Sequence, residues 1–418
     1  MSTRKSRSSP AVVSLISLAF GNASYATWSI CIADNNTKQI ALGTVTCVQN
    51  LDLLALLPVV VVGKGVGAAQ AQADTSGVRR LVIFNGLMAG TDPAVILADL
   101  VDPSHDGFYL FRQYGIVDTQ GRAVTYTGAN TLQWSGGLTG PQGTMYYAIQ
   151  GNILSGSCVV PAIEQAILNT IGDVPAKLMA GMQAARQAGG DGRCSCPGGT
   201  APCAPCPPSS FTKSGHIGGM IVARVGDTDD SVCNAQGCAD GNYFMRLNVR
   251  NQVVADPDPV DQLQILYDTW RAALAGRPDA VQSTADMSTD TLSPKEPDTA
   301  TLTITLRDIN GGPVTATIQS VQVVHAPGST GSSPIGPVVD NGDDTYTVVI
   351  GPPSTFGLDR FRITVNDGIR PVVLMPDPTL LYPATPLPAI SYGGFGLAAT
   401  LVLAAAGFIF TKRLFRTP

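Results

Sequence analysis

Two apolar segments, one near each end of the chain, limit which part of the sequence can form a globular fold. The first, residues 11–20, follows three basic residues and precedes a run of small residues that ends at Ala26. Basic, apolar and small residues in this order are typical of a secretory signal peptide. We therefore expect residues 1–26 to be cleaved off, which makes Thr27 the first residue. A short N-terminal membrane anchor is the alternative, although the apolar run is shorter than the about 20 residues a membrane-spanning helix needs.

The second apolar segment, residues 390–411, is long enough to cross a bilayer, and three basic residues follow it in 412–418. Basic residues stay on the cytoplasmic side. The pattern predicts an exported protein anchored in the cell membrane by a C-terminal transmembrane helix, with its main body extracytoplasmic. A Pro-rich spacer, 381–389, precedes the helix. This end of the chain also resembles bacterial sorting tails of the PEP-CTERM and IPTL-CTERM kind, which implies a C-terminal sorting peptidase as a partner.

Nine cysteines in an exported chain favour disulfides. Four of them crowd into an insert, residues 194–214, and there two disulfides are favoured over a zinc site, which stays the alternative. Cys31 and Cys47 lie on two runs that read as neighbouring strands, and residues 233 and 238 could close a small loop. Because nine is odd, at least one thiol is unpaired within the chain, and we expect it to be Cys158.

The composition excludes several classes of function. Charged residues make up 14% of the chain and the net charge is −5, whereas a nucleic-acid binder usually carries a basic patch. Only three histidines are present (His105, His216 and His325), which makes a histidine-based metal site unexpected. We predict no nucleic-acid partner, no cofactor and no metal.

The chain between the two ends divides into two predicted domains. In residues 27–276, strand-like alternation at 27–32 and 40–48 is followed by further strands, by helices near 162–187, by more strands, and by a helix that Asp258 caps. This order suggests a layered α+β fold. After a linker, 277–293, residues 294–380 show alternating strands separated by turns, which fits an immunoglobulin-like β-sandwich.

A free N-terminal threonine at the head of a buried strand, as Thr27 would be after cleavage, suggests one kind of chemistry. Its hydroxyl can attack a carbonyl while its own α-amine acts as the general base. The amine suits this role because its reference pKa is about 8, so much of it can be neutral near pH 7. No histidine is needed, which agrees with the composition.

Residues 27 to about 275 resemble the DUF1028 family, an uncharacterised family placed with the N-terminal nucleophile (Ntn) hydrolases. The motifs that carry the resemblance are 27–30 (TWSI), 65–68 (GVGA), 112–118 (RQYGIVD), 126–128 (YTG), 150–154 (QGNIL), 188–191 (AGGD) and 256–260 (DPDPV). The resemblance implies an αββα four-layer sandwich. The expected fold class is thus α+β, followed by the all-β immunoglobulin-like domain and the transmembrane helix.

The resemblance also implies the site. Thr27 is the candidate nucleophile and base, and Asn152 a candidate oxyanion-hole amide, with a plain strand-end turn as its alternative. Asp191 would orient the substrate or the Thr27 amine, unless it only closes a loop after a helix. Ser29, two residues along the same strand, is a candidate positioning group or second nucleophile.

The chain departs from the family after Asp191. Family members continue there with an Arg-Gln-Ser-Ala segment, whereas here the cysteine-rich insert intervenes and residues 215–218 (GHIG) take its place. No role is therefore carried over for that Arg or Ser. His216 is either a replacement or a loop histidine.

Two functions remain as hypotheses. The first is an exported amidohydrolase or peptidase of the bacterial cell envelope that acts through an acyl-ester on Thr27, with an unidentified amide or peptide as substrate. The second is a non-catalytic binding or structural module of the cell surface. A role for the β-sandwich in binding glycans or proteins ranks last. The sequence leaves open whether chains associate into a homo-oligomer.

Overall fold

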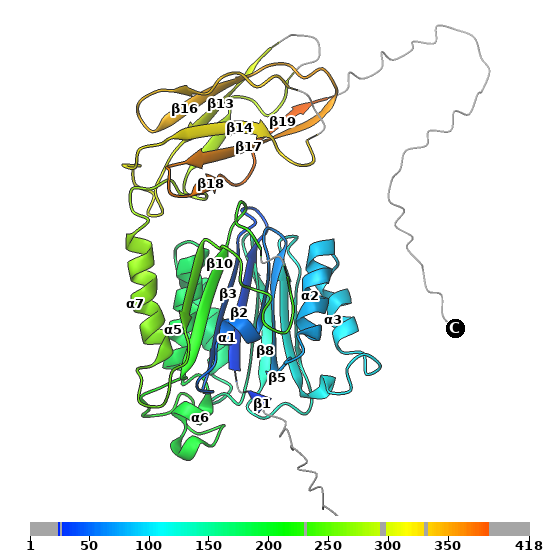
Figure 1. Ribbon diagram of the computed structural model, residues 1–418, viewed down its shortest axis with the longest axis vertical. Helices are drawn as coiled ribbons and strands as arrows, with labels where there is room; N and C mark the ends of the chain where they lie inside the picture. Colours follow the sequence, from blue (N-terminus) through cyan, green and yellow to red (C-terminus); the bar gives the residue numbers. More distant parts are fainter. Residues whose placement is uncertain (1–23, 26, 230–231, 293–297, 330–332, 384–418) are drawn as a thin grey trace, which may run out of the picture.

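Figure 1 shows the computed structural model of the chain, which describes residues 24–25, 27–229, 232–292, 298–329 and 333–383. A larger body of sheets and helices lies below a smaller all-strand body in this view. Helix α7 (Pro259–Ala272) runs along the side of the larger body and ends near the smaller one.

The larger body contains two antiparallel sheets. Sheet I has the order β1-β5-β6-β7, with β4 also paired to β5. Sheet II has the order β11-β10-β3-β2-β9-β8. The strands of sheet I are β1 (Ser24–Tyr25), β4 (Pro58–Val61), β5 (Gly65–Gln72), β6 (Arg112–Asp118) and β7 (Ala123–Thr127). Those of sheet II are β2 (Thr27–Asp34), β3 (Ile40–Thr46), β8 (Gly136–Gln142), β9 (Met145–Asn152), β10 (Ile217–Ala223) and β11 (Met245–Val249).

The sheets pack face to face because both faces of their central strands are apolar. Along β2, Cys31 and Ala33 point into an apolar layer shared with Val66 and Val117 of sheet I. The alternate residues Ile30 and Ile32 point the other way, towards helices. A period of two along a strand separates the two sets. The body therefore has four layers, with helices outside each sheet (Figure 1).

The outer layers are amphipathic helices. Helices α2 (Val78–Ala89) and α3 (Pro93–Leu100) cover sheet I. Sheet II is covered by α4 (Val159–Asn169), α5 (Val174–Gln187) and α7. Asp258 caps α7 by accepting a hydrogen bond from the amide of Val260, with Pro259 in the first turn. The short helices are α1 (Leu53–Leu56), α6 (Gly192–Ser195), η1 (Tyr109–Phe111) and η2 (Pro197–Gly199).

The smaller body is a sandwich of two four-stranded sheets around one apolar core. One sheet holds β12 (Thr284–Met287), β13 (Ala300–Thr305), β15 (Val339–Asp340) and β16 (Thr345–Ile350). The other holds β14 (Ser320–His325), β17 (Gly357–Asn366), β18 (Pro371–Val373) and β19 (Thr379–Tyr382). Strand β12 lies in the segment expected to be a linker.

Ion pairs join the two bodies. Arg224, after β10, pairs with Asp279 at 2.6 Å, and both side chains are buried. Arg370 of the sandwich pairs with Asp227 of the larger body. These contacts, together with the end of α7, hold the sandwich over one end of sheet II.

The predicted membrane anchor is contradicted. None of the helices in the described residues is long and apolar enough to cross a membrane. The longest, α5 and α7, have 14 residues each and turn only one face to the core, whereas a span needs about 20 predominantly apolar residues. The transmembrane helix is therefore removed from the predicted fold class. The predictions of a membrane partner and of a membrane-anchored localisation, which depended on that helix, are wrong as well. The segment 390–411 on which that prediction rested lies outside the described residues, as do 1–23 of the predicted signal peptide.

Four disulfides use eight of the nine cysteines: Cys47–Cys194, Cys158–Cys206, Cys196–Cys203 and Cys233–Cys238. The unpaired residue is Cys31, so the expectation for Cys158 was wrong. Cys31 pairs across the strands with Leu42, and Cys47 lies beyond the far end of β3. The two cysteines are therefore apart, although their strands are neighbours.

We predict that Cys31 is chemically silent in the folded protein. Its side chain is fully buried between the sheets, and burial raises the pKa of the thiol to about 12. Because the thiolate is the reactive form, iodoacetamide at pH 8 should leave the native protein unlabelled. After denaturation without a reductant, mass spectrometry should find one label, on Cys31. A label on Cys158 would contradict the disulfide pairing.

Candidate functional site

The predicted residues Thr27 and Asn152 meet at one end of sheet II. Strands β2 and β9 pair so that Thr27 lies directly opposite Asn152. The amide nitrogen of Thr27 donates to Oδ1 of Asn152 at 3.2 Å, and both residues are fully buried. They are 125 positions apart in the sequence, so the pairing of the two strands alone brings them together.

Two glutamines of sheet I hold this end of β2 from across the interface. Nε2 of Gln70 donates to the carbonyl oxygen of Thr27 at 2.9 Å and to Oε1 of Gln113 at 2.7 Å. Gln113 in turn donates to the carbonyl of Gly151, next to Asn152, at 2.9 Å. Both glutamines are fully buried. Neither was predicted from the sequence as a site residue, although Gln113 lies in the motif RQYGIVD.

Ser29 also faces the interface between the sheets, but its hydroxyl is hydrogen-bonded to a residue of its own sheet. Its hydroxyl donates to Oγ1 of Thr44 at 2.9 Å, and that hydroxyl donates to the carbonyl of Trp28 at 3.1 Å. Opposite this region, a side chain at Gly115 would overlap the side chain of Gln150. The interface therefore changes from apolar to polar towards the end that carries Thr27.

Asp191 is fully buried and caps the short helix α6. Its carboxylate oxygen Oδ2 accepts a hydrogen bond from the backbone amide of Cys47 at 2.7 Å. The same oxygen forms an ion pair with Nη2 of Arg193 at 2.8 Å. Burial raises the pKa of this carboxyl, and the Arg193 guanidinium acts in the opposite direction. The structure thus places Asp191 as the anchor of the loop that carries α6.

Arg193 connects Asp191 to the strand end. Its Nη2 lies 3.4 Å from Oγ1 of Thr46, the last residue of β3, which neighbours β2. Neither Arg193 nor Thr46 was predicted from the sequence as a site residue. An arginine two positions after the aspartate of the AGGD motif was the available signal.

His216 lies beside the Cys47–Cys194 disulfide. Its Nε2 is 3.5 Å from Sγ of Cys194, and the residue is 5% exposed. Burial, with Lys213 and Arg193 nearby, lowers the pKa of the imidazole to about 4. A cavity of about 230 Å³ opens here, lined by Arg193, Cys194, Thr212, Lys213, His216 and Val254.

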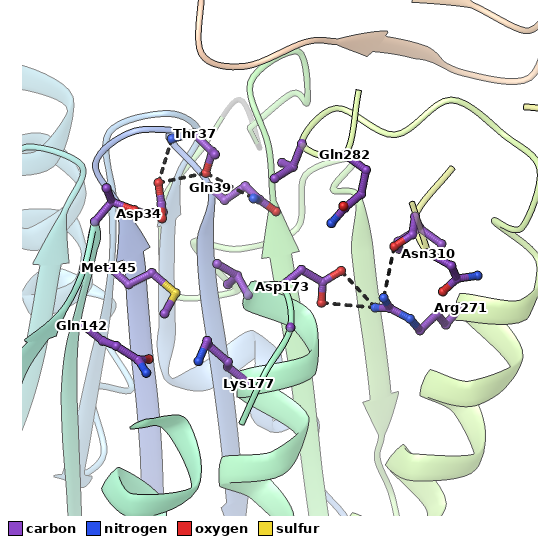
Figure 2. Close-up of a pocket in the computed structure, with 16 residues that line it drawn as sticks. Asp34, Thr37, Gln39, Gln142, Met145, Asp173, Lys177, Arg271, Gln282 and Asn310 are labelled. Carbon is purple, nitrogen blue, oxygen red and sulfur yellow. Dashed lines mark hydrogen bonds and ion pairs between the residues drawn. The ribbon is translucent and has the colours of Figure 1, made fainter. Parts of the chain in front are cut away.

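A larger cavity of about 680 Å³ lies at the opposite end of sheet II, beneath the sandwich. Figure 2 shows Asp173 paired with Arg271, while Lys177, Gln142 and Asp34 face the same space. Thr27 and Asp34 are the two ends of β2, roughly 23 Å apart at about 3.3 Å per residue. This cavity is therefore separate from the Thr27 site.

A family model described as a family of unknown function (DUF1028) matches residues 27–197. The match begins at Thr27 and ends inside the cysteine-rich insert, so it covers less than the expected 27–275. None of the curated proteins compared with the chain matches it.

Solved structures give weaker likenesses. The DUF1028-family protein SPO2555 of Silicibacter pomeroyi is 18% identical, over 58% of this chain and 88% of that one, with a TM-score of 0.42. Yersinia pseudotuberculosis InvD is 23% identical over 24% of this chain and 27% of its own, with a TM-score of 0.20. The adhesin InvE of the same organism is 21% identical over 24% of this chain and 26% of its own, with a TM-score of 0.18. At these values the likenesses say nothing about what this chain does.

We predict that Asp191 contributes to stability. Replacing Asp191 with Ala removes the cap of α6 and leaves the Cys47 amide without its acceptor, which should lower the free energy of unfolding by about 2 kcal/mol. Urea denaturation with the disulfides intact measures this. Asp191→Asn retains a hydrogen-bond acceptor for the Cys47 amide, so it should lower the free energy of unfolding by less than Asp191→Ala does.

Asp92→Ala is the matched control, because Asp92 caps α3 from an exposed position. We expect it to cost about 1 kcal/mol. An Asp191→Ala protein as stable as the unchanged chain would show that Asp191 does not anchor the loop.

Proposed function

We propose that the larger body is a hydrolase of amide or peptide bonds in which Thr27 is the nucleophile after the chain is cut between Ala26 and Thr27. The observation that carries the proposal is the 3.2 Å contact between the Thr27 nitrogen and Oδ1 of Asn152, in a buried polar region at the end of two packed sheets. Cleavage turns that same nitrogen into an α-amine already held by a side chain.

The proposed reaction uses groups of the chain alone. The hydroxyl of Thr27 attacks the substrate carbonyl and gives its proton to the α-amine, which passes it to the departing nitrogen as the C–N bond breaks. An acyl-ester on Thr27 remains. Water then attacks the ester, with the amine as base, and releases the acid.

Asn152 and Asp191 have different proposed roles. The Asn152 side chain touches the Thr27 nitrogen and is positioned to stabilise the oxyanion with its amide. Asp191 is a positioning residue, which fixes Arg193 next to Thr46. Ser29 is also a positioning residue, because its hydroxyl is bound to Thr44.

A second candidate function is a binding module without catalysis. Thr27 and Asn152 are both fully buried in the uncut chain, and this observation favours it. The state of residue 27 in the mature protein separates the two candidates, since a blocked nitrogen cannot act as base.

We predict that activity depends on a free Thr27. A chain beginning at Thr27, released from a fusion by a protease that leaves no extra residue, should hydrolyse one or more members of a panel of aminoacyl and peptidyl p-nitroanilides. Thr27→Ala should lower kcat by about 10³-fold or more, since it removes the nucleophile. Thr27→Ser should retain measurable activity because it keeps both hydroxyl and amine.

The matched control is the same chain beginning one residue earlier, at Ala26. It keeps the Thr27 hydroxyl but holds the nitrogen in a peptide bond, so it should be inactive. Equal activity of the two chains would contradict the mechanism. A folded chain that starts at Thr27 and turns over no substrate would favour the binding module.

A further inference from the structure

The strongest cluster outside the Thr27 site lies where the cysteine-rich insert meets sheet II. Sγ of Cys47, Sγ of Cys194 and a ring nitrogen of His216 all lie within 4.8 Å of one another. Three or more His, Cys, Asp or Glu side chains that lie this close together can share a metal ion, and this is the one such group among the described residues. In the structure the two sulfurs form a disulfide, and a disulfide sulfur is not the thiolate that binds metals.

We propose that this cluster is a redox-gated site for zinc or another thiophilic divalent cation, closed as the Cys47–Cys194 disulfide and opened by a dithiol reductant. The reductant supplies two electrons and two protons and is itself oxidised to a disulfide, while the S–S bond becomes two thiols. Metal binding then releases both thiol protons. Two thiolates and the imidazole are the ligands.

The geometry suits a tetrahedral ion. Nε2 of His216 is 3.5 Å from Sγ of Cys194. Two ligand atoms that share a tetrahedral zinc, at about 2.3 Å for sulfur and about 2.0 Å for nitrogen, are roughly 3.5 Å apart. The Cα atoms of Cys47 and Cys194 are 5.8 Å apart, so only side-chain rotation is needed to separate the sulfurs.

The surroundings suit the ion as well. His216 is 5% exposed, and within the described part of the chain its Nδ1 has no hydrogen-bond partner. The ring is buried, and its Nε2 already faces the sulfur of Cys194. Two thiolates balance the charge of a divalent ion, and the nearby cations Arg193 and Lys213 favour thiolates.

The fourth coordination position would face solvent. The cavity of about 230 Å³ is lined by Cys194 and His216, so water or a small anion can reach the ion. Three protein ligands with an open position are typical of zinc sites that exchange a ligand, whereas purely structural zinc sites have four protein ligands. The disulfide and the ion are alternative occupants of the same three residues.

The first test is cobalt binding by the full chain before and after treatment with a dithiol. The reduced protein should bind one Co²⁺ with the absorption bands of tetrahedral thiolate coordination, and Zn²⁺ should displace it. His216→Asn keeps all nine cysteines and should weaken Co²⁺ binding at least tenfold. The matched control, His105→Asn, alters an exposed histidine and should bind as the unchanged chain does. Equal binding by the His216 variant, or by the oxidised protein, would overturn the proposal.

A second pair of variants avoids reduction of the other disulfides. Cys47→His cannot form the disulfide but offers a nitrogen ligand beside Cys194 and His216, whereas Cys47→Ala leaves only two ligands. Without reductant, Cys47→His should bind Zn²⁺ at least tenfold more tightly than Cys47→Ala. Equal affinities in this pair would overturn the proposal even if the fully reduced chain unfolds.

Discussion

The packing of two antiparallel sheets against each other is the constraint on which the larger body depends. Strands β2 and β3 are buried on both faces, with one set of side chains in the layer between the sheets and the other beneath the helices. Each sheet needs the other to cover its inner face. A helix layer then covers each outer face, and no layer can be removed without exposing an apolar surface to water.

The same packing creates the polar end of the interface. Towards Thr27 the apolar side chains give way to hydroxyls and carboxamides, and most buried groups of this kind in proteins are hydrogen-bonded. Gln70 and Gln113 do so by binding carbonyl oxygens of β2 and β9. A network that crosses the interface fixes how the two sheets lie at that end. A site built on strand ends is held more rigidly than one built on loops.

Disulfides reinforce this end of the body. Cys47–Cys194 ties the end of β3 to α6, Cys158–Cys206 ties the start of α4 to the insert, and Cys196–Cys203 closes a loop within it. The insert therefore packs as an ordered cap around Asp191. The family match ends inside the insert, whereas sheet II continues beyond it into β10. The site and the proposed metal cluster share this cap through Arg193 and Cys194.

Local patterns in the sequence determined much of the secondary structure. Alternation predicted the hairpin of β2 and β3, and an aspartate followed by proline predicted the start of α7. Helices α2 and α3 were not predicted. The stripe on α2 is weak, and Gly77 at its start offers no side-chain cap, but Asp92 and Pro93 before α3 were a usable signal. Thr27 and Asn152 were selected together only through a family resemblance.

Only the tertiary structure decided which distant residues meet. Gln70 binds the end of β2, Gln113 the end of β9 and Arg193 the end of β3. The partner of each cysteine follows from the same packing. The sequence by itself determined where β2, β3 and α7 begin, because capping and alternation act over a few residues. It could not specify contacts between residues more than a hundred positions apart, because these depend on how whole sheets and helices pack.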